Sequence, residues 1–571
     1  MRVGRRFIKL IVCDLESALC PDIFAVGLMS VPGRRPSGAN HKKREEMKRF
    51  YAFHLCAMLL IAAGCSDGLG VEDAEDGLSD YEMGHEMIEL GLQLEDPYSV
   101  KNITKAVAAL YPTKAAGGDI TPTDKYVRFL PDTEEDMDRL HALGLDLMDH
   151  PLDYQIVKDG DYYHDPLLDA ERITWQYAVV PHDFELPEGI RCEILDECYI
   201  PSEETKSDDG IDWAAVERKA FELTGNGDLL GPETKRERSS PQGRITIVDE
   251  SANGGKPFGV AGVKVVCNSF VKFSTAYTDR DGYYQISKKY ASKVRYRLMF
   301  KNSEKFAIGL NLILFGASMS ALGKAGPEGL DYTVTAGSDR KLFCRSVVNN
   351  AVYDYIMRCG EDDLGINRPP EKLRIWIFQK LSKSCSPMLR HGTLLDQGLF
   401  ADYLGEYADL IKIFLPDIAL GLKGAETYEE IYRRTAHELA HSSHFASVGK
   451  SWWGKYVKYL LKVFVQTLDL SYGDGTGDNA GYCEVAEMWA YFLQEILYSD
   501  RYGVEMSSSG LTYWFRPQIF RYLYDRGFTV ARIFKALTED ADDAQALKGE
   551  LRNLYPDDAE TIEQVFSRYS D

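Results

Sequence analysis

The sequence predicts a multidomain α+β protein with a mixed N-terminal domain, a small β-sandwich and a mainly helical C-terminal domain. At 571 residues the chain is longer than a single hydrophobic core usually serves. Hydrophobic residues make up 45% of it, which is ample for packed cores. Short β-type runs separated by turn residues fill positions 243–302, and helix-type patterns dominate from residue 340 onward. These observations define the predicted domains.

The chain is acidic, with a formal net charge of −22 at pH 7. Nucleic-acid binding depends on clustered lysine and arginine side chains, and the sequence contains no long basic stripe. The composition therefore argues against nucleic acid as a partner and indicates a well-solvated surface.

Residues 47–64 have the order of a secretory signal peptide. Two basic residues open the segment, an apolar run follows, and small residues stand directly before Cys65. The apolar run is too short for a stable membrane-spanning helix. Residues 1–46 do not fit in front of a signal peptide, and we expect them to be a spurious extension translated from a misassigned start.

The small residues followed by Cys65 resemble a lipobox, in which the cysteine thiol takes a diacylglycerol after cleavage. The segment departs from the usual pattern at Ala62, where leucine is common. The alternative is an ordinary signal peptide followed by an incidental cysteine. The resemblance implies an exported lipoprotein of the cell envelope, anchored by Cys65 to the outer membrane and facing the periplasm or the exterior. The acidic residues 65–75 would then form a flexible tether.

Residues 76–205 are predicted to form a mixed α+β domain. A helix is expected over 81–92, and aromatic-rich runs such as 125–130 and 175–180 have the spacing of short, core-facing strands. The polar stretch 206–242 is predicted to be a linker that contains one short helix near 213–223.

Residues 243–302 alternate as strands do, first at 244–248 and again at 263–266. Residues 278–284, with the sequence TDRDGYY, form a turn leading into a further strand. Together these features resemble the carboxypeptidase regulatory-like (transthyretin-like) β-sandwich. In that family the sandwich is an accessory module, so we assign it no chemistry.

Residues 340–571 are predicted to be mostly helical. An amphipathic helix is expected over 339–359, a strand over 373–378 and a second strand within 411–422. A capping box at 427–430 (TYEE) should then begin a helix that contains no glycine or proline as far as His444.

This last helix carries the sequence HELAH. His437 and His441 lie one helical turn apart, so their imidazoles can converge on one metal ion. Zinc prefers neutral nitrogen ligands and, in catalytic sites, an open position for water. Glu438 would point beside the metal, where it can accept a proton from water.

A third metal ligand is required, and two glutamates on a later helix are candidates. His444 should lie too far along the axis to share the ion, and it is expected either to support a metal ligand or to pack. Ser447 stands where a further histidine ligand would be needed. Glu484 and Glu487, three residues apart, share one helical face.

At these motifs the chain resembles the gluzincin metallopeptidases, in which a Glu-x-x-Ala sequence on the second helix supplies the metal ligand. Glu487 and Ala490 match that spacing, whereas Glu484 does not. The resemblance implies a zincin-type domain over 340–571 that binds Zn²⁺ through His437, His441 and Glu487, with Glu484 as the alternate. It also implies hydrolysis of peptide bonds in a peptide or protein substrate. More loosely, the chain is similar to lipoproteins of gut and oral Bacteroidetes.

Other interpretations stay open at this stage. A surface-binding or assembly lipoprotein could keep the fold without hydrolysis, although such a protein has no need of Glu438. A glycan-acting or deacetylating enzyme is disfavoured by the helical His-Glu-x-x-His pattern. For the oxyanion donor, Tyr472, Tyr482 and His391 are candidates, each with a packing role as its alternative.

Overall fold

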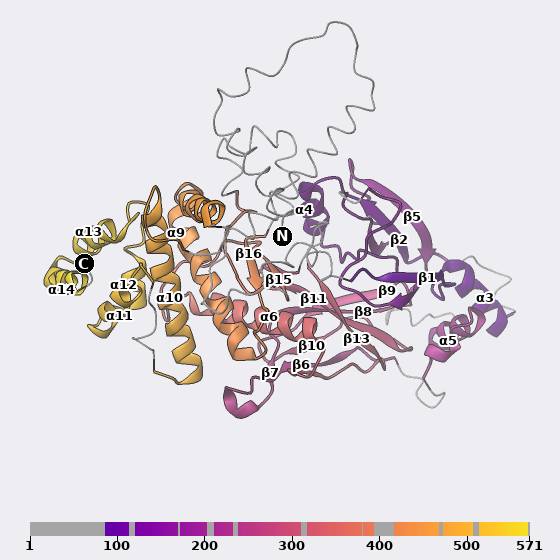
Figure 1. Ribbon diagram of the computed structural model, residues 1–571. Coiled ribbons are helices and arrows are strands. Elements are labelled where there is room, and N and C mark those ends of the chain that lie inside the picture. Colours follow the sequence, from indigo (N-terminus) through magenta and orange to yellow (C-terminus); the bar gives the residue numbers. More distant parts are fainter. Residues whose placement is uncertain are drawn as a thin grey trace, which may run out of the picture.

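The structure is a computed structural model that describes residues 86–112, 120–169, 172–201, 210–231, 238–309, 317–379, 381–392, 416–467, 472–505 and 513–568. The predicted extension 1–46, signal peptide 47–64, lipidation site Cys65 and tether 65–75 lie outside the described residues. Figure 1 shows the described chain as an elongated body, with β-sheets at the N-terminal end and in the middle and helices at the C-terminal end. The class is α+β, as the sequence predicts.

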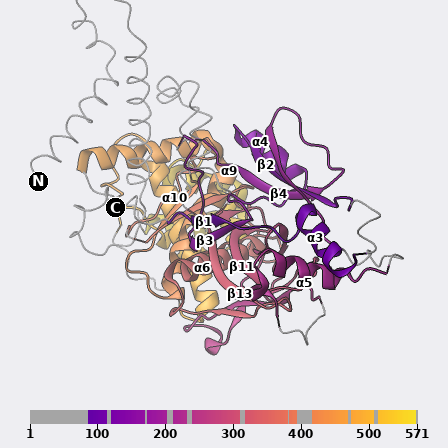
Figure 2. The same cartoon turned by 90° about the vertical axis from the view of Figure 1, so that its right-hand side faces the viewer.

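The described residues of the N-terminal part form two small sheets and three α-helices. Its strands are β1 (Glu89–Gln93), β2 (Asp124–Leu130), β3 (Tyr154–Lys158), β4 (Gln176–Pro181) and β5 (Arg191–Cys198). The helices are α3 (Val100–Leu110), α4 (Glu134–Ala142) and α5 (Trp213–Leu223). Strands β4, β2 and β5 form one antiparallel sheet, and β1 pairs with β3. Apolar residues of α3 and α5 share a core cluster, and the two helices lie side by side in Figure 2.

The prediction of a helix over 81–92 is wrong for its C-terminal end, because residues 89–92 belong to strand β1. Leu90 pairs with Ile156 across the two strands. The strands approach so closely that a Cβ atom on Gly91 would lie 2.7 Å from Val157 Cγ2. Pairing with a distant strand therefore overrides the local helical pattern.

The middle of the molecule is built from two sheets whose inner faces share one core. The first sheet contains β6 (Gln242–Ile247), β7 (Phe258–Gly259), β10 (Tyr283–Gln285) and β14 (Tyr332–Val334). The second contains β8 (Val263–Ser269), β9 (Lys272–Tyr277), β11 (Val294–Asn302) and β13 (Met319–Ala325). Ile245 and Tyr284 from one sheet are buried in the same cluster as Val265 and Leu298 from the other. The predicted strands around 244–248, 263–266 and 284 are thus present.

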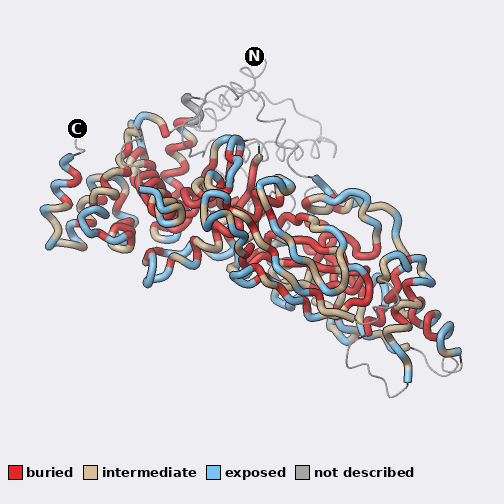
Figure 3. Tube along the Cα trace, turned by 90° about the horizontal axis from the view of Figure 1, so that it is seen from below, coloured by how far each residue is buried: buried red, intermediate tan, exposed pale blue. Residues whose placement is uncertain are grey.

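The second sheet continues past residue 302 into the C-terminal part. Strand β12 (Ala307–Ile308) pairs with β11 and lies parallel to β15 (Arg374–Phe378), which in turn lies parallel to β16 (Ile418–Gly421). A single hydrophobic cluster spans the two middle sheets and the C-terminal helices. Figure 3 shows buried segments both in the middle of the body and toward the C-terminus. The strands expected over 373–378 and within 411–422 are therefore present, and they belong to a shared sheet in which β15 is an interior strand and β16 is the edge strand.

The C-terminal part is helical, as predicted. Its helices are α6 (Arg340–Arg358), α9 (Tyr428–Thr467), α10 (Ala480–Tyr502), α11 (Gln518–Asp525), α12 (Val530–Phe534), α13 (Ala544–Leu554) and α14 (Ala559–Ser567). Helix α9 bends at Gly449, whose φ of 74° and ψ of 176° are not helical. Among the described helices, none is both long enough and apolar enough to cross a membrane.

Candidate metal centre

The helix that carries the histidines begins at the predicted capping box. The amide of Glu430 donates to Thr427 Oγ1 at 3.2 Å, and the amide of Thr427 donates to the Glu430 carboxylate at 3.0 Å. These reciprocal bonds satisfy free amides at the start of α9. They also fix where the helix begins, and the helical pitch then sets the direction of His437 and His441.

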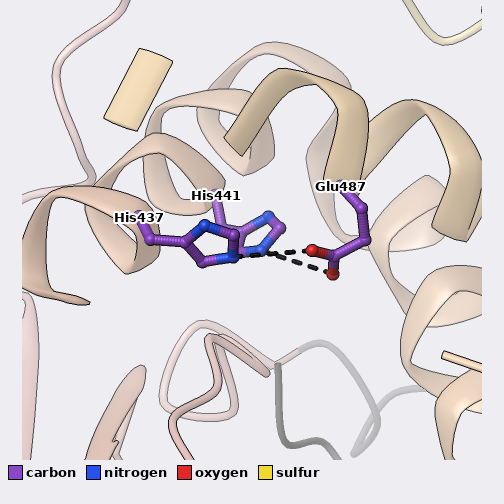
Figure 4. A group of neighbouring side chains, drawn as sticks. All are labelled: His437, His441 and Glu487. Carbon is purple, nitrogen blue, oxygen red and sulfur yellow. Dashed lines mark ion pairs between the residues drawn. The ribbon is translucent and has the colours of Figure 1, made fainter. Parts of the chain in front are cut away.

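His437, His441 and Glu487 converge between α9 and α10 (Figure 4). His437 Nε2 lies 3.5 Å from Glu487 Oε2, and His441 Nε2 lies 3.5 Å from Glu487 Oε1. One donor atom from each of the three side chains lies within 4.8 Å of the other two. Of the residues that the structure describes, no other histidine, cysteine or acidic residues form such a group.

The separation of these donor atoms suits a zinc ion. With zinc–nitrogen and zinc–oxygen distances of about 2.0–2.2 Å, ligand atoms on a tetrahedral ion lie about 3.3–3.5 Å apart. Each imidazole lies 3.5 Å from a different oxygen of the Glu487 carboxylate, a distance close to that edge length. Two histidines and one glutamate are also a ligand set of catalytic zinc sites, which keep the fourth position open. The three residues therefore fit zinc in both chemistry and geometry.

The protonation tendencies of the group also favour metal binding. Burial opposes ionisation of Glu487, but the adjacent His441 and His437 outweigh it and hold the pKa of Glu487 well below its usual range. Burial lowers the pKa of His441, so its imidazole is neutral at neutral pH. A carboxylate and a neutral imidazole are the forms that bind metal ions.

Aromatic side chains surround the group and orient its members. The Tyr456 hydroxyl, from α9 beyond the bend, donates to Glu487 Oε1 at 2.7 Å. The ring of Tyr491 lies 4.6 Å from that of His437 in an edge-to-face arrangement. Sequence reasoning missed both tyrosines, because neither stands in a spacing that marks a site. Hydrogen bonds of this kind hold a ligand carboxylate in a fixed orientation.

Glu438 lies beside the group and turns toward the segment that follows β15. Its carboxylate accepts a hydrogen bond from the Ser386 hydroxyl at 2.7 Å, and its side chain is buried. Burial raises the pKa of Glu438 to about 8, against the lowering effects of His437 and of the Ser386 bond. A carboxyl group with a raised pKa is suited to accept and return a proton near neutral pH.

The structure distinguishes the two glutamates that the sequence offered. Glu487 faces both imidazoles. Glu484 instead accepts a hydrogen bond from the Ala544 amide, at the start of α13, at 3.0 Å. It therefore supports the packing of α10 against α13, and it is not a member of the metal-binding group.

His444 packs among aromatic rings, in agreement with the packing role expected for it. Its ring lies 4.7 Å from that of Trp452 and 5.5 Å from that of Trp453. The residue is fully buried, and within the described chain neither ring nitrogen has a hydrogen-bond partner. Burial therefore lowers the pKa of His444 to about 3.

Replacing His444 with phenylalanine is expected to make the protein more resistant to acid. The folded chain keeps this imidazole neutral down to a pH near its pKa of about 3, whereas the unfolded chain protonates it near pH 6.5. The unfolded state thus binds more protons over this interval, and stability is lost as the pH falls through it. Between pH ~7.5 and pH ~5 the wild type should lose about 2 kcal/mol more unfolding free energy than the variant.

Urea denaturation of the metal-free proteins at the two pH values measures this difference. His182→Gln is the control, since it removes a histidine that is 40% exposed. Parallel pH dependence in His444→Phe and the wild type would contradict the prediction.

The three candidate oxyanion donors are engaged elsewhere. The Tyr472 hydroxyl lies 2.8 Å from that of Tyr491, and the Tyr482 hydroxyl donates to Asp542 at 3.1 Å. His391 Nδ1 lies 2.8 Å from the buried Asp417 carboxylate. Tyr472 is joined through Tyr491 to the ring of His437. The oxyanion role of any of the three stays a prediction.

Comparisons with known proteins found no relative of this chain. No family model, no curated protein and no solved structure matches it. Its function is therefore inferred from the chemistry of the site itself.

Proposed function

We propose that this protein is an exported, lipid-anchored, zinc-dependent peptidase. The observation that carries the proposal is the convergence of His437, His441 and Glu487 on one point, with Glu438 next to the first histidine. Export and anchoring through Cys65 are supported by the sequence of the N-terminal segment alone.

Each residue of the site has a distinct role in the proposed hydrolysis of a peptide bond. A zinc ion held by the two imidazoles and the carboxylate would supply Lewis acidity, which polarises a carbonyl and activates water. Glu438 accepts a proton from the attacking water and passes it to the leaving amine. Burial of the site strengthens these electrostatic interactions, because little water is present to screen them.

A second candidate function, a non-catalytic lipoprotein with a structural metal, is favoured by the burial of the group. His437 is 5% exposed, and His441 and Glu487 are 0% exposed. Structural zinc sites, however, are closed by four protein ligands. The described residues supply three, with a buried glutamate beside them that a structural site does not use. The peptidase therefore remains the better supported function.

The first test measures zinc and cleavage together. The purified wild type is expected to hold about one zinc per chain and to cleave a denatured protein substrate. A chelator should abolish cleavage and added zinc should restore it. Glu487→Gln should lose the bound zinc, because an amide is a poor ligand compared with a carboxylate.

Glu484→Gln provides the matched control, since it changes a half-buried glutamate on the same helix that bonds to Ala544 instead. It should retain zinc and activity. A wild type without zinc, or equal zinc content in both variants, would refute the assigned metal centre. Zinc without any cleavage would favour the non-catalytic alternative.

A further inference from the structure

The carboxylate of Glu438 is held by a single side chain, that of Ser386. The Ser386 hydroxyl donates to Glu438 Oε2 at 2.7 Å, and both residues are 1% exposed. Among the described residues, no other group forms a hydrogen bond with this carboxylate. Ser386 belongs to the segment after β15, far from α9 in the sequence.

Ser386 has a second acceptor within reach, the backbone carbonyl of Glu438 at 3.0 Å. That carbonyl already accepts a hydrogen bond from the Ser442 hydroxyl at 3.1 Å. A hydroxyl has one hydrogen to donate, and the side-chain oxygen of Glu438 is the nearer acceptor and the one that no other described hydroxyl engages. The geometry therefore directs the Ser386 hydroxyl to the side chain of Glu438.

The backbone of Ser386 is fixed from two sides. The indole of Trp453 donates to the Ser386 carbonyl at 2.9 Å, and the ring of Trp453 lies 5.7 Å from that of His441. The preceding residue, Cys385, exchanges two backbone hydrogen bonds of 2.8 Å with Ala419 in β16. Ser386 is thus attached both to the sheet and to the helix that carries the metal-binding histidines.

We infer that Ser386 is a positioning residue, which holds the Glu438 carboxylate in the orientation that takes a proton from the attacking water. The inference rests on the proposed function, since it concerns the base of that reaction. In the step concerned, the water oxygen bonds to the scissile carbonyl carbon while its proton passes to Glu438. The proton then moves to the amine nitrogen as the carbon–nitrogen bond breaks. A carboxylate free to rotate would meet the water less often in the productive geometry.

The experiment compares Ser386→Ala with Ser442→Ala, which removes an equally buried hydroxyl. The Ser442 hydroxyl contacts the backbone carbonyl of Glu438 and the Met388 sulfur, but not the Glu438 carboxylate. Ser386→Ala is expected to lower kcat about ten- to a hundredfold, with KM and zinc content within about twofold of the wild type. Ser442→Ala should stay within about twofold in all three quantities. Ser386→Thr, which keeps the hydroxyl, should recover most of the lost kcat.

A crystal structure of each metal-free variant gives a readout that does not depend on activity. The Glu438 carboxylate should leave its wild-type orientation in Ser386→Ala and keep it in Ser442→Ala. The inference is overturned if the carboxylate stays in place in Ser386→Ala, if kcat is unchanged, or if zinc is lost instead. A zinc-loaded wild type without cleavage would refute the proposed function, and the crystal structures would still decide whether Ser386 orients Glu438.

Discussion

Glutamine in place of Glu438 is expected to lower kcat by at least about a hundredfold while leaving zinc bound. General-base catalysis contributes about 10²–10⁴ to a rate, and an amide cannot accept the proton. Glutamine has nearly the shape of glutamate and can still accept the hydrogen bond from Ser386, so the fold and the three metal-binding residues should be unaffected. Steady-state cleavage of a peptide, together with the zinc content of the same preparation, measures both halves of the prediction.

The outcome separates the roles of the two neighbouring glutamates. Glu438→Gln should hold zinc without cutting, whereas Glu487→Gln should lose the zinc itself. Glu484→Gln serves again as the control, since it changes a half-buried glutamate of the same helix away from the metal-binding group. Full activity in Glu438→Gln would show that another group accepts the proton, and the peptidase mechanism given above would be wrong.

The helix carrying the histidines could be predicted because each step depends on near neighbours. The capping box fixes the start of α9, and the helical pitch then places His437 and His441 on one face. The choice of Glu487 over Glu484 depended on a resemblance, that is, on the alanine three residues further on. The structure brings Glu487 and not Glu484 to the imidazoles.

The groups that orient this site could not be predicted, because they reach it through the tertiary fold. Ser386 follows a strand of the sheet, and Tyr456 and Trp453 lie beyond the bend at Gly449. Nothing in their local spacing distinguishes them from core residues. Their roles depend on how α9 folds back and on which loop meets Glu438, and both are set by long-range packing.

The pairing of the strands could not be predicted from the sequence for the same reason. Residues 89–92 have a helical pattern but form β1, because β3 offers a close partner. Strand β14 joins β6 in parallel from outside the range 243–302, and β12 links the middle sheet to β15. The alternation of side chains indicates that a segment is a strand, but it does not identify the neighbouring strand.

A stability prediction concerns the junction between the N-terminal part and the middle sheets, where Glu217 is buried with no exposed surface. Its carboxylate accepts a hydrogen bond from Tyr98 at 2.6 Å and pairs with Lys272 of β9 at 3.1 Å and with Arg238 at 2.8 Å. Burial opposes ionisation of Glu217, but Lys272 and Arg238 outweigh it and lower its pKa. The network therefore joins α5 to β9 through a buried ion pair.

Glu217→Gln is expected to lower the unfolding free energy by about 3–5 kcal/mol, because it leaves the Lys272 ammonium buried without its counter-charge. Urea denaturation measures the loss, and hydrogen exchange should place the earliest opening in α5 and β9.

Glu222→Gln on the same helix is the matched control: its carboxylate is 51% exposed beside Lys219, and its loss should cost under about 1 kcal/mol. Adding Lys272→Met to Glu217→Gln should recover much of the loss, since it removes the more deeply buried of the two charges left without a partner, the other being Arg238. Equal stability of Glu217→Gln and Glu222→Gln would show that the buried pair does not stabilise this junction.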